Sequence, residues 1–162
     1  MDVKVILQDI KKLETDALVV GFYQDVRPLK GLAGELDWLL CGSLSDLILN
    51  NKLSGSLGEV ALLASRGKVP AKKIFMIGLG PQKGSSASSL RNAARISASS
   101  AVGAGVMNMA VEYFYSPGVP HDAVVTALRD GLSEGARGNP LTVLLLAPDA
   151  ATHERISAWV KA

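Results

Sequence analysis

The strongest constraint on the fold of this chain is the alternation of strand-length apolar runs with amphipathic helical patterns. Continuous apolar runs, typical of strands covered on both faces of a sheet, occur at Ala17–Val20, Val60–Leu63, Ile74–Ile77 and Val143–Leu146. A fifth run, Val3–Leu7, alternates apolar residues with others, which is the pattern of a half-exposed edge strand. The sixth, Met109–Tyr115, is interrupted by Glu112. The sequence therefore predicts six strands.

Four helices are predicted between or after these strands. The first covers about 34–50, where large aliphatic residues repeat at three- and four-residue steps. The second, about 86–103, begins with a serine cluster suited to N-capping and has a face of alanines that allows a close approach to a sheet. The third follows Pro120, and the last covers about 152–160.

The order of these elements indicates the fold class. Strands and helices interleave along the chain, and such interleaving is typical of sheets joined by right-handed crossovers. We therefore expect a three-layer α/β fold, in which a mixed, mainly parallel six-stranded sheet carries helices on both faces. Because no internal repeat or linker interrupts the pattern, residues 1–162 are expected to form a single domain.

Charge and composition exclude several classes of protein. The net charge is only +2 and the basic residues are scattered, so no nucleic-acid partner is expected. No apolar run approaches the roughly 20 residues of a membrane span, and the charged first residues do not resemble a signal peptide. The single cysteine, Cys41, fits a reducing compartment, and we expect it to be buried or half-buried within the first helix. A cytoplasmic location, with no membrane contact, follows as an expectation.

The search for catalytic groups identifies no catalytic residue, metal ligand set or cofactor motif. The two histidines, His121 and His153, stand near predicted helix starts, each with one adjacent acid, and neighbours in sequence point to different sides of a helix. We interpret both as surface or capping residues. Glu35 and Asp37, on the first helix, are placed to interact favourably with its dipole.

Glycines around the first helix suggest one possible binding feature. Gly31 and Gly34 lie in the segment Leu29–Leu36, where backbone amides at a helix start can hold a phosphate group. Glycines at the same positions also permit a tight turn without any ligand. Both interpretations remain open at the level of the sequence.

Several segments resemble the N-terminal domain of the leucyl (cytosol) aminopeptidase family. They are Thr15–Val20, Leu29–Asp37, Gly58–Leu63, Lys73–Gly80 and the helix from Ser88, so the resemblance covers essentially the whole chain. In that family the peptidase chemistry resides in a separate C-terminal domain that holds two metal ions with an Asn-Thr-Asp-x-Glu-Gly-Arg segment. No such segment occurs here, and we therefore expect no peptide hydrolysis.

The same family domain has a macro-domain-like fold, and this resemblance implies a set of ligand contacts. It assigns Asp9 to adenine recognition, residues 31–34 (with Ala33) to a first phosphate loop, and residues 114–120 (with Ser116) to a second. Gly21–Gln24 stands where hydrolytic macro domains have asparagines, and the second loop contains one glycine in place of several. ADP-ribose hydrolysis is accordingly not expected.

Two functional hypotheses follow from these observations. The first is a non-catalytic domain that acts by association, either with itself or with a partner protein. Four aromatic residues could serve that role if they are exposed, or could belong to the core: Phe22, Tyr23, Tyr113 and Tyr115. The alternative is binding of ADP-ribose or a related nucleotide, with contacts from Asp9, Gly31, Ala33, Gly34 and Ser116.

Overall fold

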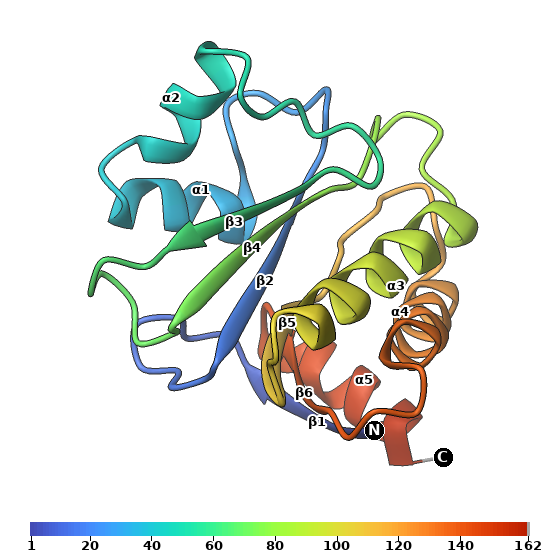
Figure 1. Ribbon diagram of the computed structural model, residues 1–162. Helices are drawn as coiled ribbons and strands as arrows, with labels where there is room; N and C mark the ends of the chain where they lie inside the picture. Colours follow the sequence, from blue (N-terminus) through green and yellow to red (C-terminus); the bar gives the residue numbers. More distant parts are fainter. Residues whose placement is uncertain (162) are drawn as a thin grey trace.

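A six-stranded mixed sheet lies at the centre of the molecule, in a computed structural model that describes residues 1–161 (Figure 1). The strands are β1 (Asp2–Leu7), β2 (Ala17–Phe22), β3 (Val60–Ala64), β4 (Lys73–Gly78), β5 (Asn108–Glu112) and β6 (Thr142–Ala147). Their spatial order is β1-β6-β5-β2-β4-β3, and every neighbouring pair is parallel except the antiparallel pair β3–β4. The predicted mixed, mainly parallel sheet is confirmed.

Helices cover both faces of this sheet and complete the three predicted layers (Figure 1). They are α1 (Gly31–Leu39), α2 (Ser43–Leu49), α3 (Ala87–Gly103), α4 (His121–Ala136) and α5 (Ala150–Lys161). The first two pack on one face, and the other three pack on the opposite face. Within residues 1–161, no helix combines the length and apolarity needed to cross a membrane.

Alternating side chains of the central strands build two separate cores. In β2, Leu18 and Val20 point to the core beneath α1 and α2, whereas Val19 points to the core beneath α3 and α4. All six residues of β2 are buried. The continuous apolar runs predicted for covered strands therefore match β2 and β4, which have helices on both sides.

The strand β3 differs from the prediction, because it is not covered on both faces. It forms the edge of the sheet, where Val60 and Leu62 are 40% and 54% exposed while Ala61 and Leu63 pack toward α1 and α2. An edge strand next to only one helical layer has the same apolar composition as a covered strand. The sequence pattern could not separate the two cases.

The single helix predicted over residues 34–50 is two helices. The chain leaves α1 at Leu40 and turns through Cys41 and Gly42, which have φ values of 57° and 82°. Oδ1 of Asp37 then accepts hydrogen bonds from the backbone N–H groups of Leu44 and Ser45, at 2.9 and 3.1 Å. Asp37 thus stabilises the start of α2, whereas the sequence predicted that it would interact with the dipole at the start of a single helix. Its carboxylate accepts hydrogen bonds from N–H groups that have no partner within α2.

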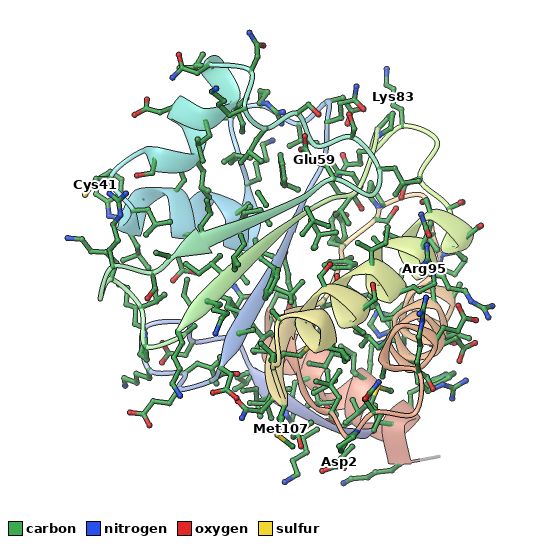
Figure 2. The ribbon with its side chains drawn as sticks, in the orientation of Figure 1. Asp2, Cys41, Glu59, Lys83, Arg95 and Met107 are labelled. Atoms are coloured by element: carbon green, nitrogen blue, oxygen red, sulfur yellow. The ribbon has the colours of Figure 1, made fainter. Side chains whose placement is uncertain are left out.

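The turn between α1 and α2 also places Cys41 differently from the prediction. Cys41 is exposed rather than buried or half-buried, and it lies at the outer end of this helical layer (Figure 2). Its side chain points away from the core because the helix has already ended at this position.

The helix α3 begins as predicted, but its alanine face packs most closely against another helix and not against the sheet. Ser86 caps the helix through hydrogen bonds exchanged with Ser89, at 3.2 and 3.0 Å. The alanine face packs most closely against α4, not against the sheet. A methyl group at Gly131 or Gly135 would overlap a backbone carbonyl oxygen of α3. The two helix backbones are therefore almost in contact.

We predict that Gly131→Ala lowers the free energy of unfolding by about 2 kcal/mol, because the added methyl group forces α3 and α4 apart. Gly103→Ala is the matched control, since Gly103 is also helical and has open space around its Cβ position. The control should leave stability unchanged or raise it by up to about 1 kcal/mol. Urea denaturation of both variants measures the difference, and equal stabilities would contradict the close packing of α3 and α4.

Candidate functional site

A cavity of about 580 Å³ opens at the carboxyl ends of β2 and β5, beside the start of α1. Open α/β sheets bind ligands at this end of their strands. The walls come from the end of β2, the loop 23–31, the segment after β4 and the segment after β5. In Figure 2, Lys83 and Glu59 lie at this same end of the sheet.

The carboxyl group of Glu112 connects three elements at the base of this cavity. It stands at the end of β5, and Oε2 accepts a hydrogen bond of 2.9 Å from the backbone N–H of Gly21 in β2. The backbone N–H of Leu32, in the first turn of α1, also lies close enough to the carboxyl group to lower its pKa. A Cβ at Gly31 would lie 3.9 Å from Oε1. Glu112 therefore fills the position in which a helix start attracts an anion.

The pKa of Glu112 reflects opposing effects. Burial raises the pKa to about 8, and the N–H groups of Gly21 and Leu32 oppose that rise by stabilising the charged form. Glu112 as a whole residue is half-buried and lines the cavity.

Hydrogen bonds hold the surrounding loops together. Arg27 donates to the carbonyl oxygens of Tyr23 and Ser54, at 2.8 and 3.0 Å. Asp25 accepts from the backbone N–H of Gln82 at 2.7 Å, and its pKa is lowered mainly by this bond. These contacts join three loops around the opening of the cavity.

The four aromatic residues singled out from the sequence differ in how far they are exposed. Phe22, Tyr23 and Tyr113 are buried, whereas Tyr115 is 65% exposed and lines the cavity. The hydroxyl of Tyr23 donates a 2.5 Å hydrogen bond to the carbonyl oxygen of Tyr115, and burial is the main cause that raises the pKa of Tyr23. Tyr115 is thus an accessible aromatic ring beside a group of polar atoms.

The structure brings together only some of the residues predicted for ligand binding. Gly31 and Ala33 line the cavity. Gly34 is not among the lining residues, and a Cβ there would come within 2.7 Å of the carbonyl oxygen of Leu29. Ser116 is buried next to the cavity-lining Tyr115, and its hydroxyl has no hydrogen-bond partner among residues 1–161. Asp9 is exposed, follows β1 and is not among the lining residues.

Of the polar and aromatic residues that line the cavity, Glu112 and Arg27 were not predicted as site residues, and Tyr115 was predicted only as a member of the second phosphate loop, residues 114–120. Glu112 carried a signal, because a lone carboxylate in an apolar strand needs a partner. From the sequence, Glu112 was interpreted only as an interruption of a strand. Arg27 and Tyr115 stand in loops, where the sequence carries no periodic signal.

Both histidines make a hydrogen bond to another part of the fold, and His121 does not cap α4 as its interpretation as a capping or surface residue suggested. Nδ1 of His121 pairs with the hydroxyl of Tyr113 at 2.8 Å, and burial is the main cause that lowers the pKa of His121. Nε2 of His153 lies 3.2 Å from the carbonyl oxygen of Val5. Among residues 1–161, His, Cys, Asp and Glu side chains do not gather in threes that could hold a metal ion.

The stability of the protein should depend on pH through Glu112. Because its folded pKa of about 8 lies above the ordinary carboxyl value of 4.5, the folded state holds the extra proton between these values. Its contribution to stability is complete below 4.5 and is lost as the pH rises to about 8.

Glu112→Gln, which mimics the protonated carboxyl group, should therefore flatten the decline in thermal stability across this pH range. Glu35→Gln is the control, because Glu35 is exposed on α1. An unchanged pH profile in the Glu112 variant would show that Glu112 does not titrate in this range.

Comparison with known proteins gives two kinds of similarity. The model of the cytosol aminopeptidase family, N-terminal domain, matches residues 19–137. A probable cytosol aminopeptidase of Geobacter sulfurreducens is 31% identical over 136 residues, which cover 83% of this chain and 27% of that protein. The chain thus spans about a quarter of the length of this relative.

Solved structures show the same fold. A mutant of tomato leucine aminopeptidase matches with a TM-score of 0.72 and 19% identity, covering 99% of this chain and 35% of the other. A macrodomain of Oceanobacillus iheyensis, solved with ADP, matches with a TM-score of 0.78 and 14% identity, covering 98% and 89%. The macro-domain-like fold that the sequence predicted is confirmed.

Proposed function

Because the chain belongs to the cytosol aminopeptidase family as its N-terminal domain, which lies outside the catalytic domain, we propose that it is a non-catalytic module that binds an adenosine-type ligand. The observation that carries the proposal is the cavity between α1 and the ends of β2 and β5. A cavity of about 580 Å³ lies within the range that small-molecule sites occupy.

The chemistry of the walls supports a ligand with a flat ring and hydroxyl groups. Tyr115 offers an exposed ring for stacking, and apolar walls are supplied by Phe22, Leu79 and Phe114. Glu112 and the backbone atoms of the rim offer hydrogen-bond acceptors that suit a sugar. The neighbour from Oceanobacillus iheyensis was solved with ADP, which agrees with this ligand class.

The residues that line the cavity are better suited to binding a ligand than to catalysing a reaction. Glu112 is the one cavity-lining group with a strongly raised pKa, and it is engaged with two backbone N–H groups of the protein itself. A group held in this way is positioned to shape a binding site. We therefore assign no catalytic residue, and we keep the cytoplasmic location as an expectation.

We predict that adenosine binds to the wild-type protein and that Tyr115→Ala weakens its affinity about tenfold, because a stacking platform is lost. Trp38→Ala is the matched control: Trp38 is 84% exposed but is not among the cavity-lining residues. Calorimetric titration measures both affinities. Equal affinities in the two variants would remove Tyr115 from the site.

The contact proposed for Asp9 has its own test. Asp9→Ala should abolish binding if adenine reaches across the end of β6 to the segment after β1, as the resemblance to macro domains implies. Adenosine binding that is unchanged in this variant would restrict the ligand to the cavity between α1 and β5.

A second proposal, association with another copy of the chain, rests on the uncharged edge strand β3. Exposed sheet edges pair with other chains unless charges or proline prevent it. The edge strand β1 carries Asp2 and Lys4, whereas β3 contains no charged residue and exposes Val60 and Leu62. Two copies of β3 can pair in antiparallel fashion about a two-fold axis.

Leu62→Lys should shift the protein from dimer to monomer, because it places a charge near the middle of this edge. Leu7→Lys is the control, since Leu7 has the same 54% exposure on the opposite edge strand. Light scattering after size-exclusion chromatography gives the masses. A wild-type protein that is monomeric at high concentration would contradict association through β3.

A further inference from the structure

We propose that Glu112 determines the ligand specificity of the cavity. Its carboxyl group occupies the position at the start of α1 where a phosphate group would otherwise bind, so the cavity selects ligands that have no phosphate group there. This inference rests on the proposed binding of an adenosine-type ligand. It adds that the cavity distinguishes adenosine from its phosphorylated forms.

The N–H groups at the base of the cavity already face an acceptor of the protein itself. The first amides of a helix have no partner within the helix, so they are directed toward any acceptor beyond its end. Gly21 of β2 donates to Glu112, and the N–H of Leu32, in the first turn of α1, faces the same carboxyl group closely enough to lower its pKa. The two N–H groups that would otherwise converge on a ligand oxygen are already satisfied by a side chain.

The carboxyl group of Glu112 also takes up the space beside these amides. Oε1 of Glu112 lies 3.9 Å from the Cβ position of Gly31, and Gly31 has a φ of 59°, a conformation suited to glycine. The open side of Gly31 therefore faces the carboxyl group. A phosphate group at this place would have to displace Glu112 and break both of its hydrogen bonds.

Charged side chains of both signs line the cavity. Two cationic side chains also line the cavity, but Arg27 is occupied by the carbonyl oxygens of Tyr23, Val26 and Ser54. Lys30 is exposed at the rim. Asp25 adds a second carboxylate to the cavity wall. A diphosphate in the cavity would thus meet the carboxyl groups of Glu112 and Asp25 as well as the side chains of Arg27 and Lys30, so its exclusion rests on Glu112 holding the base of the cavity.

The experiment compares adenosine and ADP as ligands of the wild type, Glu112→Ala and Asp25→Ala. The wild type should bind ADP at least about tenfold more weakly than adenosine. Glu112→Ala frees the N–H groups of Gly21 and Leu32, and it should gain at least about tenfold in ADP affinity. Asp25→Ala removes a carboxyl group from the cavity wall but leaves Glu112 in place, so it should retain the preference for adenosine.

A second measurement uses the wild type alone and remains decisive if Glu112→Ala is unfolded. Inorganic phosphate should leave the amide NMR signals of Gly21 and Leu32 unchanged in the wild type, because Glu112 already holds both N–H groups. Phosphate-induced shifts of these two signals would overturn the inference.

The outcomes separate the inference from the proposed function. Wild-type protein that binds ADP as tightly as adenosine would overturn the role of Glu112 while retaining a nucleotide-type site. If neither compound binds to the wild type or to either variant, the proposed function itself fails. An equal gain in ADP affinity for Asp25→Ala and Glu112→Ala would overturn the inference in favour of a general effect of charge.

Discussion

The complete burial of β2 is the constraint on which the rest of this structure depends. Each of its six residues is enclosed, with parallel neighbours β4 and β5 on its two sides. A parallel strand in this position needs helices on both faces of the sheet, because both sets of its side chains are apolar. α1 and α2 on one side, and α3 and α4 on the other, meet that need. The loops that lead to these helices therefore converge at the carboxyl ends of β2 and β5, where the cavity lies.

The two helical layers use different means to cover the sheet. On one side, α3 and α4 approach so closely that only glycine fits at Gly131 and Gly135, and the two helices behave as one packed unit. On the other side, α1 and α2 are short and are separated by a turn, with Asp37 bonded to the start of α2. The short α1 places its first N–H groups beside Glu112 at the end of β5. That placement makes the base of the cavity polar.

Glu112 links the fold to the candidate function. A carboxyl group at the end of a buried strand costs free energy unless its oxygens find donors. Gly21 and Leu32 supply those donors, so one side chain joins β5, β2 and α1. The same contacts place a carboxyl group where an open helix start would attract a phosphate. A likeness of fold to a macrodomain therefore does not carry over the chemistry of the ligand site, which depends on single residues such as this one.

The sequence by itself determined the order and type of the elements, because apolar periodicity is a local property that each segment carries alone. It predicted the six strands, the cap at Ser86 and helices on both faces. It also placed Gly31 and Ala33, which line the cavity, near the start of the first helix. Local periodicity could not show that β3 is an edge or that the helix over residues 34–50 is divided, since a leucine repeat continues through the turn at Cys41 and Gly42. Only the tertiary structure decided what Glu112 does, because its donor Gly21 lies 91 positions away and comes into contact through the pairing of β5 with β2.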